Sequence, residues 1–316
     1  MKKILLASTA LVGFAGAAAA EVSLSGYAEI GIKGGTGMQS QFHNDIDVTF
    51  NLTGESDSGL SFGATIDLDE VTSSAEVGGA GSFNKSSVWV KGSFGKVTLG
   101  DTDGAADWAV SEIYLGTALT DDHSTHAGAY WGTGLDGIYD GQVMRYEYSF
   151  GSFGVAVSAE IDDTLDTADS TATAYNDTTA YGDANLGIGV KWSGDMGGTS
   201  VNAGLGYQSN GDSDVVELSA GASMASGVSV AIEYADGDLD KSVATADDQW
   251  WGLGVGYTAN GVTAQVNYGE YDSGANGWGL VVNYDLGGGA VAMLGYGDSG
   301  GTATGNTWSA GLGLSF

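Results

Sequence analysis

The stretch Gln249–Tyr268 reads QWWGLGVGYTANGVTAQVNY and shows the pattern that decides the fold. Apolar side chains occupy every second position before the short turn at Ala259–Gly261, and the same alternation resumes after it. A period of two over this length is typical of a β-strand whose two faces meet different surroundings. The stretch therefore predicts two antiparallel strands that are joined by a short turn.

The same alternation recurs from Val22 to Phe316 and predicts 16 strands. Short turns such as Gly151–Ser152 alternate with longer polar segments such as Gly34–Gln41 and Asp69–Lys85. Successive hairpins then present long loops at one end and tight turns at the other, as in an up-and-down barrel of an outer membrane. The predicted fold class is all-β, a 16-stranded antiparallel transmembrane β-barrel.

Composition and charge exclude several classes of protein. The chain of 316 residues has 9 Lys and Arg against 40 Asp and Glu, so it lacks the basic footprint of a nucleic-acid-binding protein, and no nucleic-acid partner is expected. It has no Cys, which excludes disulfides and thiolate chemistry, and no Pro, which fits an uninterrupted strand ladder. Only 16% of residues are charged, which indicates that part of the surface does not face water.

Residues 1–20 read MKKILLASTALVGFAGAAAA and predict a cleaved signal peptide. Lys2 and Lys3 precede a short apolar stretch, and Ala18 and Ala20 fit a small-residue cleavage site. The alternative, an uncleaved membrane helix, is disfavoured because the apolar stretch is short. We therefore expect export through the periplasm and a barrel formed by residues 21–316.

The two faces of the predicted strands differ in a way that indicates a channel. A closed barrel of 16 strands is too wide for its side chains to fill and leaves a water-filled lumen. The apolar set then faces lipid, the small polar set faces the lumen, and Tyr and Trp near the strand ends form two girdles. The alternative is a secreted soluble acidic β-protein with a dry core, which explains neither the loop lengths nor the girdles.

Several segments carry a resemblance to a known family. They are SDSGLSFGA (Ser56–Ala64), GSFGKVTLGD (Gly92–Asp101), YADGDLDK (Tyr234–Lys241), YDLGGGA (Tyr284–Ala290) and the terminal Leu312–Phe316. On these segments the chain resembles general diffusion porins of the alphaproteobacterial, Gram-negative type. The resemblance implies a homotrimer in the outer membrane, in contact with lipid and lipopolysaccharide, that passes small hydrophilic solutes and ions without a required cofactor. It also implies that the third extracellular loop folds inward and narrows the pore.

The segment Gly100–Asp140 is the longest connection and the candidate constriction loop. It carries no Lys or Arg, and rings of Asp and Glu in a narrow pore select cations. The predicted constriction acids are Asp101, Asp103, Asp107, Glu112, Asp121, Asp122 and Asp136. The alternative is a solvated acidic loop that lies over the mouth of the barrel.

The predicted pore wall follows from the alternation along the strands. The inward positions include the bases Lys33, Lys91, Arg145 and Lys191 and the acids Asp45, Asp47 and Glu147. The resemblance implies pore-facing arginines on the second strand, whereas this chain has His43, Asp45 and Asp47 there. We therefore expect a cation-selective channel. Two alternatives remain: Asp45 and Asp47 lie near a mouth and matter little, or the channel is specific for one substrate.

No enzyme or defined metal site is predicted. The chain lacks a G-x-S-x-G nucleophile motif. His123 and His126, beside Asp121 and Asp122, form only a weak metal-binding pattern. The run Asp236-x-Asp238-x-Asp240 fails as an EF-hand because Lys241 stands where Gly is needed. The acidic loops are nevertheless expected to bind Ca²⁺ or Mg²⁺ at sites that the sequence does not locate.

The outward face of the predicted strands is asymmetric. Between Val22 and Leu99 its positions contain no Tyr or Trp, whereas many follow from Met144 onward. Because interfacial Tyr and Trp mark contact with lipid headgroups, this absence predicts that Val22–Leu99 supplies most of the trimer interface.

Overall fold

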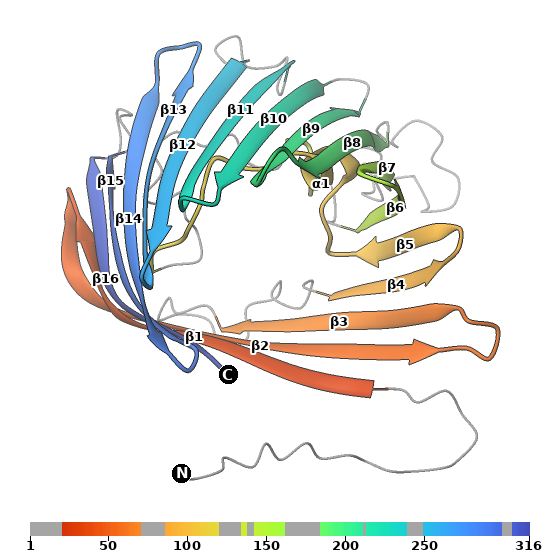
Figure 1. The fold of residues 1–316 in the computed structure, drawn as a ribbon, viewed down its shortest axis with the longest axis horizontal. Coiled ribbons are helices and arrows are strands. Elements are labelled where there is room, and N and C mark those ends of the chain that lie inside the picture. Colours follow the sequence, from red (N-terminus) through yellow and green to blue (C-terminus); the bar gives the residue numbers. More distant parts are fainter. Residues whose placement is uncertain are drawn as a thin grey trace, which may run out of the picture.

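The computed structural model is a closed antiparallel β-barrel of 16 strands with a short helix inside it (Figure 1). It describes residues 21–70, 86–119, 134–137, 142–161, 184–210, 213–238, 249–298 and 305–316. The strands are β1 (Glu21–Gly35), β2 (Met38–Glu55), β3 (Ser61–Glu70), β4 (Ser86–Gly92), β5 (Gly95–Gly100), β6 (Val143–Phe150), β7 (Phe153–Glu160), β8 (Asn185–Asp195), β9 (Thr199–Ser209), β10 (Asp214–Met224), β11 (Val228–Asp238), β12 (Gln249–Ala259), β13 (Val262–Tyr271), β14 (Asn276–Gly287), β15 (Ala290–Asp298) and β16 (Asn306–Ser315). The predicted fold class is confirmed.

Each strand pairs with its sequence neighbour, and β1 pairs with β16 to close the ring. The closing register runs from Tyr27 opposite Ser315 to Gly35 opposite Thr307. Beyond it, the backbone N–H of Phe316 donates to the carbonyl of Gly26 at 2.8 Å. Closure leaves no open sheet edge, which is what a sheet in hydrocarbon requires. Within the described residues, no helix is long and apolar enough to cross a membrane.

The prediction of a long polar loop at Gly34–Gln41 is wrong. Strand β1 continues to Gly35, β2 begins at Met38, and only Thr36 and Gly37 form the turn. Gly37 has φ of +75°, a conformation in which a residue without Cβ is not strained. The alternation continues through the polar residues of β2, so polarity alone did not mark the end of the strand.

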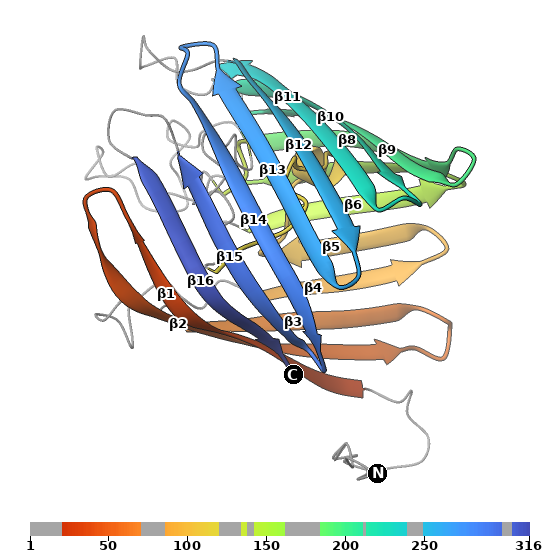
Figure 2. The ribbon, with the colours of Figure 1, turned by 60° about the vertical axis from the view of Figure 1, so that its left-hand side comes forward.

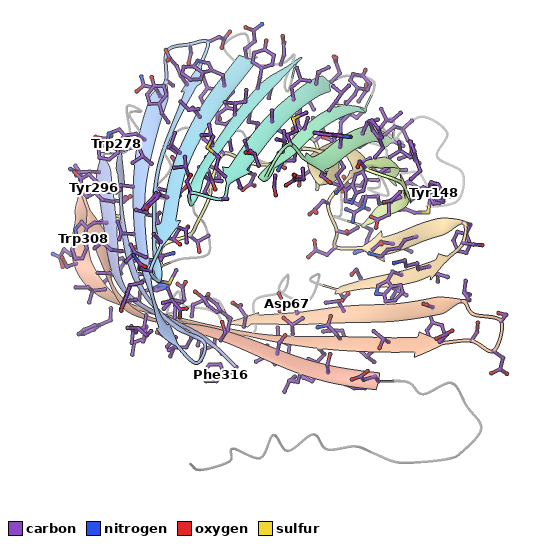
Figure 3. The ribbon with its side chains drawn as sticks, viewed as in Figure 1. Asp67, Tyr148, Trp278, Tyr296, Trp308 and Phe316 are labelled. Carbon is purple, nitrogen blue, oxygen red and sulfur yellow. The ribbon has the colours of Figure 1, made fainter. Side chains whose placement is uncertain are left out.

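Outward and inward side chains separate as the alternation predicts (Figure 3). Tyr148, Trp278, Tyr296 and Trp308 lie on the outside of the barrel, and Asp67 lies on the lumen side of β3. The outward apolar side chains of the strands are largely exposed in the single chain, as expected for groups that face lipid or another protein.

The helix α1 (Ala105–Ala109) lies inside the barrel against β7, β8, β9 and β10 (Figures 1 and 2). Its three alanines, Ala105, Ala106 and Ala109, are fully buried. They face glycines of the wall: a Cβ on Gly189 would lie 1.8 Å from the carbonyl oxygen of Ala105, and one on Gly204 would lie 2.1 Å from that of Ala109. The wall glycines therefore make room for the backbone of the loop.

We expect Gly189→Ala to push α1 off the wall. The methyl group has no space, and overpacking of this kind costs about 1–3 kcal/mol. The temperature at which the fast-migrating folded band disappears in a heat-modifiability gel should fall. Gly26→Ala is the matched control, because its Cβ would meet nothing nearer than 3.5 Å. Equal melting temperatures for the two variants would contradict this packing.

Candidate functional site

The described part of the long segment after β5, residues 101–119, runs around the inner wall of the barrel. After α1, Ile113 packs against Gly252 and Gly254 of β12. A Cβ atom on Gly254 would lie 1.9 Å from the carbonyl oxygen of Ile113. The Leu119 side chain packs against Gly31 of β1 and Gly311 of β16. A Cβ atom on Gly31 would lie 2.3 Å from Leu119 Cδ1, and one on Gly311 would lie 2.7 Å from it. The loop thus crosses the lumen side of much of the barrel and narrows it.

Polar side chains of the wall hold the backbone of this loop. Ser158 and Ser219 accept hydrogen bonds from the N–H groups of Ala105 and Ser111, each at 2.8 Å. Gln265 accepts from the Leu115 N–H at 2.7 Å and donates to the Gly116 carbonyl at 2.9 Å. Further along, the Asn283 side chain donates to the Thr117 carbonyl at 2.9 Å. These bonds satisfy backbone groups that lie away from a regular ladder.

Residues 134–137 return beside the start of the loop and are tied to it through Asp136. One carboxylate oxygen of Asp136 accepts from the Gly104 N–H at 2.6 Å, and the other accepts from the Gln208 amide at 2.5 Å. Gln208 also accepts from the Leu135 N–H at 2.8 Å, and Glu160 accepts from the Gly137 N–H at 3.1 Å. The outgoing and returning parts of the loop are therefore fastened to each other and to β7 and β9.

Two of the four predicted wall bases bind the loop. The Arg145 guanidinium donates to the Asp103 carbonyl at 2.5 Å and to the Glu147 carboxylate at 3.2 Å, and its side chain is 8% exposed. The Lys191 ammonium donates to the Trp108 carbonyl at 2.9 Å and lies 3.5 Å from the centroid of the Trp108 ring. Lys33 is half-buried and Lys91 is exposed. The charges of Arg145 and Lys191 thus hold the loop at the wall.

The predicted loop acids fall into two groups. Asp101 and Asp103 are exposed, the latter with 64% of its side chain accessible. Asp107, Glu112 and Asp136 are half-buried between the loop and the wall. Asp101, Asp103, Asp107 and Asp136 line one small cavity of about 170 Å³. Asp121 and Asp122, together with His123 and His126, lie outside the described residues.

Burial changes the ionisation of two loop acids. Burial, helped by the neighbouring negative charges of Asp103 and Asp136, raises the pKa of Asp107 to about 8. Burial also raises the pKa of Asp136, whereas the hydrogen bonds from Gly104 and Gln208 lower it, with a result of about 6. Asp107 is therefore mostly protonated at neutral pH and adds little to the field of the lumen there.

The wall formed by β2 and β3 is acidic. Asp45 and Asp47 lie near the middle of β2, on the side of the strand that carries His43. His43 is buried and pairs with Glu29 of β1 at 2.8 Å. Asp67 of β3 accepts a hydrogen bond from the Thr49 hydroxyl at 2.9 Å and points into the lumen (Figure 3).

Several wall residues were missing from the sequence-based site. Asp67 and Lys96 both occupy inward positions, and the alternation that placed Lys91 inward would have found them. Lys96 lies 3.9 Å from Glu147, a predicted wall acid that also contacts Arg145. The loop-binding groups Ser158, Gln208 and Gln265 had no signal of their own, because nothing in a sequence shows which wall residues a distant loop will touch. Among the described residues, no group of three His, Asp or Glu side chains is placed to hold a metal.

Comparisons with known proteins agree with this architecture. The family model described as Gram-negative porin matches residues 7–311. A porin of Rhodobacter capsulatus is 31% identical over 301 residues, which cover 88% of this chain and 94% of that protein.

Solved structures give the same result. A porin structure refined at 1.8 Å has a TM-score of 0.69 at 26% identity and covers 94% of this chain and 100% of its own. A mutant porin of Rh. blastica has a TM-score of 0.69 at 18% identity, with the same coverage, and supports the fold alone. A closed barrel, an inner loop and a family match that spans nearly the whole sequence lead to one conclusion: the chain belongs to the Gram-negative porin family.

Proposed function

We propose that this outer-membrane diffusion channel is cation-selective. Part of the inner wall of the barrel is not contacted by the described residues of the loop. The charge of this uncovered wall is the observation that supports the proposal. The described loop residues bind the inner faces of β7–β10, β12–β14, β16 and β1, so these contacts leave open the wall of β2–β5. On this wall Asp45 is buried, and Asp47 and Asp67 are half-buried, with Asp67 on the lumen side (Figure 3). Asp101 and Asp103 are exposed on the loop.

The contacts of three positively charged side chains in the lumen also support cation selectivity. Arg145 is engaged by Glu147 and by the loop, and Lys191 by the Trp108 carbonyl. Lys96 lies beside Glu147 and, at 5.8 Å, over the ring of Trp89. The acids Asp45, Asp47 and Asp67 of the wall and Asp101 and Asp103 of the loop outnumber Lys91 and Lys96, the bases of β4 and β5, so the net field at the opening is negative, and low-dielectric walls concentrate it. A field of one sign favours the entry of small hydrophilic cations over anions of the same size.

We expect the triple variant Asp45→Asn, Asp47→Asn, Asp67→Asn to lower the cation-to-anion permeability ratio several-fold at pH 6. One charge about 4 Å from an ion is worth about 1 kcal/mol even in bulk water. The measurement is the reversal potential of planar bilayers in a salt gradient. A wild-type channel that prefers anions, or a triple variant with an unchanged ratio, would contradict the proposal.

Asp107→Asn is the matched control for this experiment. Because the pKa of Asp107 is about 8, the wild-type side chain is neutral at pH 6 and its replacement should leave the ratio unchanged. At pH 9.5 the wild-type carboxyl is ionised, so the same replacement should lower the ratio. The control therefore separates the charge of the open wall from that of the buried loop acid.

We further propose that the chain works as a homotrimer whose contacts come mainly from β1–β5. In the described residues of these strands, most outward positions carry aliphatic side chains or Phe, and none carries Tyr or Trp. Strand β5 has 6 residues and β4 has 7, so β5 spans about 20 Å at most, against an apolar band of about 25 Å. A wall this short is better covered by protein than by lipid.

Cysteine cross-linking tests the interface cleanly, because the chain has no native Cys. Ile66→Cys, on the outward face of β3, should give dimer and trimer bands with a bifunctional thiol reagent in native membranes. Val255→Cys, on the outward face of β12 and similarly exposed, should stay monomeric. Cross-linking through residue 255 but not through residue 66 would place the interface on the opposite wall.

A further inference from the structure

Trp89 is an aromatic side chain on the lumen side of the uncovered wall. It lies in the middle of β4, between the outward residues Val88 and Val90. In the strand register it lies opposite Gly63 of β3 and Thr98 of β5. A large aromatic group therefore occupies an inward position among the charged and hydroxyl side chains of this wall.

The Trp89 ring lies across Gly63. A Cβ atom on Gly63 would lie 2.6 Å from Cζ2 of the ring and 2.7 Å from Cε2, so the ring has room there because residue 63 is a glycine. One side of the ring rests on the backbone of β3, and Trp89 is half-buried, with the rest of its surface toward the lumen. An aromatic ring that is supported in this way offers a surface on which another ring can stack.

Hydrogen-bonding side chains lie on the same face of the wall on both sides of this ring. Two residues further toward the long loops, Thr65 lies opposite Ser87, and the Thr65 hydroxyl donates to the side-chain oxygen of Asn51 at 3.1 Å. Two residues toward the short turns, Lys91 lies opposite Ser61 and is exposed. An apolar surface between hydroxyl and ammonium groups matches the shape of a sugar ring, which has C–H groups on its faces and hydroxyl groups around its rim.

The charges around Trp89 favour a neutral ligand over a charged one. The Lys96 ammonium lies 5.8 Å from the centroid of the ring, and Lys91 lies directly opposite Lys96, so an organic cation would meet two like charges there. An organic anion would meet the net negative field of the opening, to which Asp47 and Asp67 contribute. A neutral ring meets neither repulsion.

We propose that Trp89 stacks on the ring of neutral pyranose sugars as they pass through the channel. The C–H groups on the face of a pyranose carry partial positive charge and contact the negative face of the indole, while the sugar hydroxyls reach the polar side chains on either side. The proposal rests on the channel function and the uncovered wall proposed above, but not on cation selectivity, since Trp89 is uncharged. Weak binding of this kind is compatible with passage, which requires that a bound solute can leave.

A comparison of maltose with sorbitol separates stacking from simple occupancy of the pore. Maltose consists of pyranose rings, whereas sorbitol is an open-chain polyol without a ring face. Each is titrated in solutions of equal viscosity while the ion conductance of the full protein is recorded in planar bilayers, and the change in bulk conductivity is subtracted. We expect maltose to lower the wild-type conductance saturably and to add current noise, and we expect sorbitol to do neither.

Two substitutions of Trp89 test the residue itself. For Trp89→Ala we expect the apparent dissociation constant of maltose to rise about two- to ten-fold, the range for contacts between aromatic rings, with the reversal potential in a salt gradient unchanged. Trp89→Phe keeps a smaller ring and should give an intermediate constant. Trp251→Ala is the matched control, because it removes a Trp that is 45% exposed on the outer face of β12, and it should bind maltose as the wild type does.

Equal effects of maltose and sorbitol on the wild-type conductance would overturn the proposal, and this comparison needs no variant to fold. A Trp89→Ala channel that binds maltose as tightly as the wild type would also overturn it. A wild-type channel that prefers anions would contradict the proposed cation selectivity but not the stacking, which the maltose titration decides separately.

Discussion

Closure of the strand ladder is the constraint on which the rest of this structure depends. In hydrocarbon an unpaired backbone group costs several kcal/mol, so a sheet that crosses a membrane must have no edge. The pairing of β1 with β16 and the bond from Phe316 to Gly26 remove the last edge. Closure also fixes the sides: one set of alternate residues faces lipid or protein, and the other faces water.

The lumen side is shaped by what lies within it. A loop that is folded into a barrel needs room for its backbone and partners for its N–H and C=O groups. Glycines such as Gly189, Gly204 and Gly254 give the room, and Ser158, Ser219 and Gln265 give the partners. The loop occupies that wall and binds Arg145 and Lys191. The proposed selectivity therefore rests on the charges of the wall that the described contacts leave open, namely Asp45, Asp47 and Asp67 against Lys91 and Lys96.

The fold could be predicted almost fully from the sequence, and the site only in part. The alternation of Trp251, Leu253, Val255 and Tyr257 reports directly which face is apolar, so strands, faces and closure followed from it. The seating of the loop depends on contacts between residues far apart in the chain, such as Gly104 with Asp136. Ionisation depends on burial, so the acid count of the loop did not reveal that Asp107 holds its proton at neutral pH. In the segment Gly34–Gln41, which the sequence predicted to be a loop, all residues except Thr36 and Gly37 belong to strands, because polar side chains also face a wet lumen.

The central claim is that ions pass between the seated loop and the acidic wall of β2 and β3. Reaction of a single engineered cysteine with a charged, membrane-impermeant thiol reagent during single-channel recording tests it most directly. For Asp67→Cys the account predicts a stepwise fall in conductance when the reagent is added. For Leu68→Cys, the next residue on the outward face, it predicts no change. A fall for Leu68→Cys together with an unaffected Asp67→Cys channel would contradict the account.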